Sequence, residues 1–294
     1  MTEATGVTEV DVVVIGLGPG GEATANKLAE DGLSVVGVEK GLVGGECPYY
    51  GCVPSKMAIR AANALAESRR VPALAGGSTT VPDWTPVAKR IREQATDDWD
   101  DTVAVERLED HGAKLLRGHG RLVGPREVEV DGQRVRARKA VVLDTGTDPG
   151  APPVKGLDAT PYWTNRDVVK LTELPTSLAI IGGGAIGCEF AQAFRRFGVE
   201  VTILEAADRI MSSEEPETSG LMTKVFAADG VRVMPGVEVE EVSHADGLFR
   251  LTLGGEVVTA EKLLVAAGRV PQIKEIGLDT VDVDPDVEHL TTDG

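Results

Sequence analysis

The sequence contains two glycine-rich turns, each preceded by a short apolar run and each followed by a glutamate at the same distance. The turns are Gly16-Leu17-Gly18-Pro19-Gly20-Gly21, after residues 12–15, and Gly182-Gly183-Gly184-Ala185-Ile186-Gly187, after residues 178–181. Glu39 and Glu205 each lie 23 positions after the first glycine of their turn. Residues 22–31 and 185–197 have helix length, and residues 33–38 and 200–204 have the character of a following strand. The pattern therefore predicts two βαβ units.

Each turn has the residues that a dinucleotide site requires. The first glycine allows a tight turn, the second lets the backbone approach a pyrophosphate, and the third lets the helix pack on the strand. The helix N-terminus then faces the phosphates, and the glutamate accepts hydrogen bonds from ribose hydroxyls. Two incidental glycine turns are a much weaker interpretation, because strand, turn, helix, strand and acid occur in order twice.

The identity of the second acid bears on the choice of coenzyme. A carboxylate at Glu205 repels the 2′-phosphate of NADP, so the sequence favours NAD. The alternative is that Glu205 is a solvated strand end that discriminates little.

A close cysteine pair lies between the two turns, in Cys47-Pro48-Tyr49-Tyr50-Gly51-Cys52. The pair precedes a helical segment at residues 55–69, and a helix N-terminus stabilises thiolate, the reactive form. Two buried structural cysteines or half a zinc site are the alternatives. A zinc site needs two more ligands, and Cys188 and the four histidines have no matching spacing. The spacing thus favours a redox pair and no metal; Cys188 is expected to be a core residue.

Composition excludes several partner classes. The net charge of −17 disfavours nucleic acid and anionic membranes as partners. No apolar stretch approaches the ~18 residues of a membrane span, and the leader, residues 1–9, is polar and acidic, unlike a signal peptide. These features predict a cytoplasmic protein.

The expected fold class is α/β, with two Rossmann-like (dinucleotide-binding) βαβ domains and a helical insertion. The predicted domains are residues 1–152, residues 153–270, and a return to the first domain at residues 271–294. We also expect a charged helix over residues 87–111, paired strands over residues 128–145, and strands at residues 231–239, 248–253 and 263–266.

Together these segments resemble the pyridine nucleotide–disulfide oxidoreductases, a flavoprotein family that includes dihydrolipoamide dehydrogenase, glutathione reductase, mycothione reductase and mercuric reductase. Residues 44–56 are similar to its GG-x-C-x(4)-C-x-P-S-K signature, and residues 265–271 to its G-R-x-P element. Residues 144–149 resemble its A-T-G-x-x-P element, except that Leu143-Asp144 replaces the usual alanine. Tyr49 and Tyr50 also depart from the smaller residues of many relatives.

The resemblance implies FAD on the first turn and NADH on the second. Hydride would pass from NADH to one flavin face, and the reduced flavin would break a Cys47–Cys52 disulfide on the other. Cys52 would contact the flavin, and Cys47 would attack a substrate disulfide. Lys56 would lie near the flavin and pair with Glu189. The implied cofactor-binding residues are Gly16, Gly18, Gly20, Gly21, Glu39, Lys40, Gly45, Glu46, His119, Gly120, Thr145, Gly146, Gly182, Gly184, Ala185, Ile186, Gly187, Glu205, Val237 and Gly268.

The resemblance also implies a C-terminal interface domain with a catalytic histidine and a homodimer. None of His111, His119, His244 and His289 stands in the matching motif, so we expect a fragment of a longer protein, which alone would bind FAD less tightly and reduce disulfides poorly. The most similar activity is that of dihydrolipoamide dehydrogenase. Alternatives are a mercuric or mycothione reductase, a flavin NADH oxidase or diaphorase, and a dinucleotide-binding module without dithiol catalysis.

Overall fold

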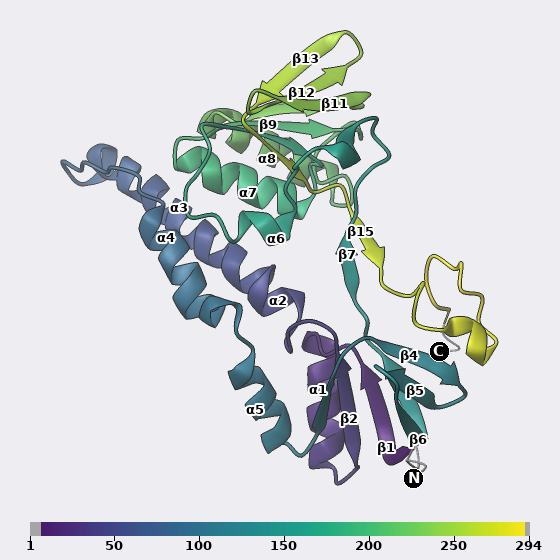
Figure 1. The fold of residues 1–294 in the computed structure, drawn as a ribbon. Helices are drawn as coiled ribbons and strands as arrows, with labels where there is room; N and C mark the ends of the chain where they lie inside the picture. Colours follow the sequence, from purple (N-terminus) through teal and green to yellow (C-terminus); the bar gives the residue numbers. More distant parts are fainter. Residues whose placement is uncertain (1–6, 292–294) are drawn as a thin grey trace. The chain divides into compact units, whose positions relative to one another are not determined.

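The computed structural model describes residues 7–291 and divides into two compact units (Figure 1). Unit 1 comprises residues 1–49, 97–148 and 270–294, and unit 2 comprises residues 50–96 and 149–269. The first six residues of the predicted polar leader and the last three residues of the predicted segment 271–294 lie outside the described part. As cofactor-binding domains, the predicted segments 1–152 and 153–270 stay predictions.

Unit 1 is built on a six-stranded sheet in the order β3-β2-β1-β6-β5-β4. The first four strands of this order are parallel, and β5 and β4 are antiparallel to their neighbours. Its strands are β1 (Thr8–Ile15), β2 (Val35–Glu39), β3 (Lys114–Arg117), β4 (Gly120–Gly124), β5 (Glu127–Val130) and β6 (Gln133–Leu143). Its helices are α1 (Pro19–Glu30), α2 (Glu46–Tyr49), η2 (Asp97–Trp99), α5 (Thr102–Asp110) and η4 (Leu278–Val281).

The strand β1 is buried on both faces over residues 12–15, because these four residues are all apolar. Val12 and Val14 pack with Ala25 of α1 and Leu108 of α5. The other face, which includes Val13, packs against the β4–β6 strands and residues 273–278. The first predicted βαβ unit, β1-α1-β2, is thereby confirmed.

Unit 2 has a four-stranded parallel sheet in the order β10-β9-β8-β14 and a separate antiparallel sheet, β11-β12-β13. Its strands are β8 (Ser177–Ile181), β9 (Glu200–Glu205), β10 (Arg232–Pro235), β11 (Glu241–Ala245), β12 (Leu248–Leu253), β13 (Glu256–Ala260) and β14 (Lys262–Val265). Its helices are α3 (Cys52–Leu74), α4 (Thr85–Arg90), η1 (Ile91–Ala95), η3 (Leu157–Ala159), α6 (Asn165–Val168), α7 (Ala185–Arg196) and α8 (Pro216–Asp229). The two remaining strands, β7 (Thr147–Pro149) and β15 (Arg269–Pro271), pair with each other.

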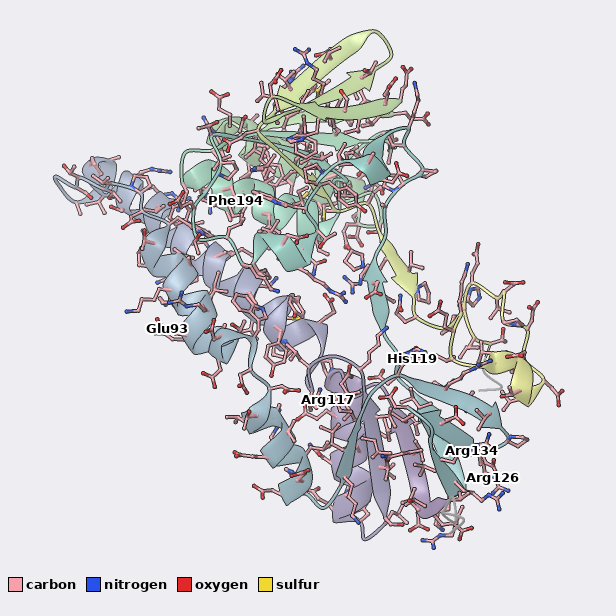
Figure 2. All side chains as sticks on the ribbon, viewed as in Figure 1. Glu93, Arg117, His119, Arg126, Arg134 and Phe194 are labelled. Atoms are coloured by element: carbon pink, nitrogen blue, oxygen red, sulfur yellow. The ribbon has the colours of Figure 1, made fainter. Side chains whose placement is uncertain are left out.

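Helix α3 belongs to unit 2 because it packs along α7. Ala58 and Ala62 are buried in α3, and the side chain of Arg69 donates to the carbonyl of Arg196 (2.6 Å). Trp84 packs edge-on against Phe194, with ring centroids 5.4 Å apart. Phe194 lies on α7 and is labelled in Figure 2. The second predicted βαβ unit, β8-α7-β9, is confirmed, and with it the predicted α/β class of two Rossmann-like units.

Two of the predicted elements were wrong in extent. The single helix over residues 87–111 is broken, because Asp97, Asp98 and Trp99 adopt left-handed backbone angles with φ of 47°, 58° and 59°. The strand over residues 231–239 ends at Pro235, where Gly236 turns the chain with φ of 68°. Residues 133–143, 248–253 and 262–265 form strands where predicted. Within residues 7–291, no helix combines the length and the apolar character needed to cross a membrane.

Candidate functional site: two dinucleotide cradles and a dithiol segment

The first glycine turn connects β1 to α1 and leaves no room for a side chain at two of its glycines. Gly16 has φ of 92°, and a Cβ there would lie 2.1 Å from the carbonyl oxygen of Asp144. A Cβ at Gly21 would lie 2.0 Å from the carbonyl oxygen of Gly16. Glycine is therefore required at both positions by the close approach of strand and helix. Gly18 is the N-cap residue of α1, and Gly20 is exposed.

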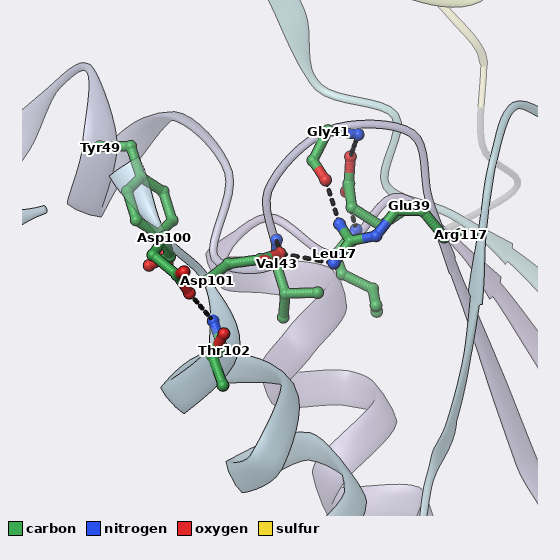
Figure 3. Close-up of polar contacts among 9 residues, drawn as sticks. All are labelled: Leu17, Glu39, Gly41, Val43, Tyr49, Asp100, Asp101, Thr102 and Arg117. Carbon is green, nitrogen blue, oxygen red and sulfur yellow. Dashed lines mark hydrogen bonds and ion pairs between the residues drawn. The ribbon is translucent and has the colours of Figure 1, made fainter. Parts of the chain in front are cut away.

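Glu39 fixes the other side of this turn. The backbone N–H of Leu17 donates to its Oε2 (2.8 Å), and that of Gly41 donates to its Oε1 (2.7 Å), as Figure 3 shows. Each carboxylate oxygen has a second lone-pair direction, so Glu39 can still accept from a ribose hydroxyl. Glu39, the acid predicted at the end of the strand, thus contacts the first glycine turn, which begins 23 positions earlier at Gly16.

The second glycine turn repeats this arrangement in unit 2. A Cβ at Gly182 would lie 2.3 Å from the carbonyl oxygen of Ala266, and one at Gly187 would lie 2.1 Å from that of Gly182. The N–H of Gly183 donates to Oε2 of Glu205 (2.6 Å), and that of Ala207 donates to Oε1 (2.8 Å). Both turns therefore have the backbone that a dinucleotide needs.

The remaining predicted binding residues of unit 1 lie on several elements, and one of them contacts the first glycine turn directly. Gly45 lies against Gly18, since a Cβ on Gly45 would be 2.9 Å from the Gly18 Cα. Lys40 donates to the side chain of Gln272 (3.3 Å), and a ring nitrogen of His119 lies 3.3 Å from the carbonyl oxygen of Glu275. Glu46, Gly120, Thr145 and Gly146 are distributed over α2, β4 and the segment after β6.

In unit 2, the N–H of Val237 donates to the carbonyl of Glu205 (3.0 Å), so Val237 lies beside the second cradle. Ala185 and Ile186 are the first two residues of α7, and Gly184 is its N-cap. Gly268 precedes β15 and accepts from the N–H of Gly150 (2.9 Å). A cavity of about 280 Å³ lies along α3 and α7, lined by Ala185, Cys188 and Glu189 among others.

The dithiol segment is placed at helix starts. Cys47 is half-buried in α2, and Cys52 is exposed as the first residue of the 23-residue helix α3. Cys52 therefore lies at the positive end of the α3 dipole. Pro54 is buried at the third position of the helix, where it has no N–H to leave unsatisfied.

Lys56 and Glu189 form the ion pair that the resemblance implied. Nζ of Lys56, one turn after Cys52, lies 2.5 Å from Oε1 of Glu189 on α7. The pair joins the start of α3 to the helix that begins at the second glycine turn. Both side chains retain contact with water, with 60% and 32% of their surfaces exposed.

The two tyrosines of the cysteine loop differ in environment. Tyr49 is buried, and its hydroxyl donates to the carbonyl of Asp100 (3.4 Å) (Figure 3). Burial, and next the carboxylate of Asp101, raise the pKa of Tyr49. Tyr50 is half-buried, with the cations of Arg166 and Lys170 at 5.6 and 5.3 Å from its ring centre. Tyr49 therefore contributes to the core of unit 1.

Cys188 is a core residue, as predicted. It is 2% exposed, and its thiol donates to the carbonyl of Gly183 (3.2 Å). Burial, together with the carboxylates of Glu205 and Glu189, raises the pKa of Cys188 to about 12. Within the described residues, no three His, Cys, Asp or Glu side chains are grouped as metal ligands would be.

Sequence reasoning missed the side chains that hold the loop after Glu39. Asp101 accepts from the N–H of Val43 (2.7 Å) and from Arg117 (2.7 Å), which also donates to the carbonyl of Gly41 (Figure 3). The contacts of Asp101 with Val43 and of Arg117 with Gly41 join residues 58 and 76 positions apart, and no local pattern marks them. Asp144 was noticed as an unusual residue, but its contact with the first glycine turn was not foreseen; the N–H of Gly21 donates to its Oδ2 (2.6 Å).

Comparisons with known proteins agree with this geometry. A family model described as pyridine nucleotide-disulphide oxidoreductase matches residues 10–289. The chain is 36% identical over 282 residues to a mercuric reductase from Acidithiobacillus ferrooxidans, a match that covers 94% of this chain and 51% of that protein. It is 33% identical over 281 residues to a dihydrolipoyl dehydrogenase from Chlamydia pneumoniae, covering 94% and 60%.

Among solved structures, the HOCl-induced flavoprotein disulfide reductase RclA from Escherichia coli is similar, with a TM-score of 0.80 and 26% identity over 92% of this chain and 59% of that one. The chain spans about half the length of the mercuric reductase (51%), and somewhat more of the dihydrolipoyl dehydrogenase (60%) and of RclA (59%). The match across residues 10–289 shows that the chain belongs to the pyridine nucleotide-disulphide oxidoreductase family.

Proposed function

We propose that this chain is the FAD- and NADH-binding part of a disulfide reductase. The electron pair of NADH would reach the Cys47–Cys52 disulfide by way of FAD and pass from the resulting dithiol to a substrate disulfide. The proposal is supported most directly by the Lys56–Glu189 ion pair. It ties the helix that starts at Cys52 to the helix that starts at the second dinucleotide turn.

The residues of the two cradles fit dinucleotides. In unit 1, the first glycine turn, Glu39 and Gly45 would hold FAD, and the carboxylate of Asp144 lies over this turn. In unit 2, the second glycine turn and Glu205 would hold NADH. Bound FAD would supply the two-electron chemistry that links a hydride donor to a disulfide.

The two cysteines would carry out thiol–disulfide exchange. Cys47 as thiolate attacks one sulfur of the substrate disulfide, and the other substrate sulfur leaves as a thiolate that takes up a proton. Cys52 as thiolate then attacks the sulfur of Cys47, which releases the second substrate thiol and leaves a Cys47–Cys52 disulfide. The substrate disulfide is reduced to two thiols, the protein dithiol is oxidised, and NADH is the reductant that restores it.

The Cys47→Ser variant tests this proposal. We expect it to lose disulfide reduction and to retain NADH-dependent dye reduction, because the electron pair reaches FAD before it reaches sulfur. Cys188→Ser is the matched control, since Cys188 is buried in α7 and is not a member of the cysteine pair, and this variant should retain both activities. Unchanged disulfide reduction in Cys47→Ser would contradict the relay and would favour a diaphorase that does not use the cysteines.

A second candidate is reduction of a thiol-bound metal ion, because several relatives at 29–36% identity are mercuric reductases. It would use the same NADH, FAD and dithiol. NADH consumption that depends on Hg(II) in the presence of excess low-molecular-weight thiol, and that exceeds consumption with lipoamide, would favour this candidate. Faster NADH consumption with lipoamide than with Hg(II) would favour a disulfide as the substrate.

A further inference from the structure

The carboxylate of Asp144 lies over the first glycine turn. Strand β6 runs parallel to β1 with Leu143 opposite Ile15, and the N–H of Asp144 donates to the carbonyl of Ile15 (2.8 Å). This pairing brings the side chain to the start of α1, where its Oδ2 accepts the N–H of Gly21 (2.6 Å). A Cβ on Gly20 would lie 3.2 Å from Oδ1, and one on Gly18 would lie 3.7 Å from Oδ2.

The second cradle has the same backbone without the carboxylate. The residue that matches Asp144 is Ala266, which follows β14 and donates its N–H to the carbonyl of Ile181 (2.8 Å). Its carbonyl faces Gly182 as that of Asp144 faces Gly16. Gly184, the counterpart of Gly18, has no atom within 4 Å of a built Cβ. One cradle therefore carries an anionic side chain over its turn, and in the other this space is open.

The carboxylate of Asp144 lies at the start of α1, a position that favours an anion. The first turn of α1 presents backbone N–H groups and the positive end of the helix dipole. Pro19, the first residue of the helix, has no N–H, so the donors are fewer than in an ordinary helix. Asp144 takes the N–H of Gly21, the third glycine of the fingerprint. A pyrophosphate bound at this helix start would meet a negative charge already held there.

We propose that Asp144 is an internal competitor for the pyrophosphate of the dinucleotide that binds the first cradle. Its side chain must rotate away from Gly21 when the ligand binds. The carboxylate therefore stabilises the ligand-free form and lowers the affinity for FAD. This inference rests on the proposed function, because it takes FAD as the occupant of the first cradle.

The test compares Asp144→Ala, Asp144→Asn and the control Asp31→Ala in flavin-stripped protein. Asp31 lies just beyond the other end of α1, where it pairs with Lys27, and its loss changes the net charge equally. FAD affinity is measured by fluorescence titration, and the thermal stability of the flavin-free protein by its Tm. Neither measurement depends on turnover.

We expect Asp144→Ala to bind FAD about tenfold more tightly than the unmodified protein and to lower the flavin-free Tm by roughly 3 °C. Asp144→Asn keeps an acceptor for Gly21 without the charge, so it should bind FAD more tightly with a smaller loss of Tm. Asp31→Ala should leave the FAD affinity unchanged. Binding of NADH to the second cradle should be the same in all four proteins.

The outcomes separate the two proposals. FAD binding of equal or lower affinity in Asp144→Ala would overturn the competitor role while leaving FAD as the ligand. An absence of FAD binding in all four proteins would overturn the competitor role together with the proposed function. A reciprocal variant, Ala266→Asp, should weaken NADH binding at the second cradle, and unchanged NADH binding in it would also contradict the competition.

Discussion

Lys56 on α3 and Glu189 on α7 are joined by an ion pair of 2.5 Å, although 133 residues separate them in the sequence. The Lys56 side chain is 60% exposed, so water screens the pair. Exposed ion pairs of this kind typically contribute about 0–1 kcal/mol to stability. The pair therefore stabilises the fold little, and its position one turn after Cys52 is the basis of the role proposed for it.

We predict that Lys56→Met changes the free energy of unfolding by less than about 1 kcal/mol and slows flavin reduction by NADH at least roughly tenfold. The physical reason is that the variant loses a positive charge on α3, one turn after Cys52. Urea unfolding and anaerobic stopped-flow absorbance measure the two quantities. Lys27→Met is the matched control, because Lys27 also forms an exposed ion pair, with Asp31, in the other unit. Equal rates of flavin reduction in the two variants would argue against the role of Lys56.

Glu205→Arg should shift coenzyme preference toward NADPH. A guanidinium at the end of β9 attracts the 2′-phosphate that the carboxylate repels, so the ratio of kcat/KM for NADPH to that for NADH should rise at least about tenfold. The variant also loses the acceptor for the N–H groups of Gly183 and Ala207, which should lower stability by about 1 kcal/mol. Glu200→Arg makes the same change of charge at the exposed start of β9 and should leave the ratio as it is. A ratio that does not move in Glu205→Arg would show that Glu205 does not contact the ribose.

Cys188 should resist alkylation in the native protein. Burial, with two nearby carboxylates, raises the pKa of its thiol from 9.0 to about 12, so little thiolate forms at pH 8.5. Iodoacetamide labelling followed by mass spectrometry should modify Cys188 only after unfolding, whereas the exposed Cys52 should react in the folded chain. Rapid labelling of Cys188 in the native protein would contradict this prediction, because it would show that α7 opens readily.

The same shift predicts a pH dependence of stability. Between about pH 9 and pH 12 the unfolded chain loses the Cys188 proton while the folded chain keeps it, so this thiol makes stability fall as pH rises. Below pH 9 both states hold the proton and the contribution is constant. Cys188→Ala should have a shallower decline of unfolding free energy above pH 9, and an identical decline would contradict the assignment.

The sequence predicted the features that depend on local pattern. Gly16 and Gly182 mark the two turns because only glycine fits the contact with the neighbouring strand end, and the apolar runs before them form buried strands. The spacing from each turn to Glu39 or Glu205 is set by the length of one helix and one strand, so the sequence predicted the positions of these glutamates as well. The helix expected over residues 55–69 lies within α3, which begins three residues earlier, at Cys52, and ends at Leu74.

Contacts between segments far apart in the chain could not be predicted from the sequence. The helix expected over residues 87–111 breaks at Asp97 without a glycine or proline to signal it. The contact of Asp144 with Gly21 depends on the register of β6 against β1, which no local pattern specifies. Asp101 and Arg117 hold the loop after Glu39 through contacts of the same long-range kind.

The visible spectrum of the purified protein before and after anaerobic addition of NADH tests the central claim most directly. The account predicts a flavin spectrum that gains a long-wavelength band from a thiolate beside the flavin, and the loss of this band in Cys52→Ser. A colourless preparation that does not take up added FAD, or a reduced protein whose long-wavelength absorbance is the same with serine at position 52, would contradict it.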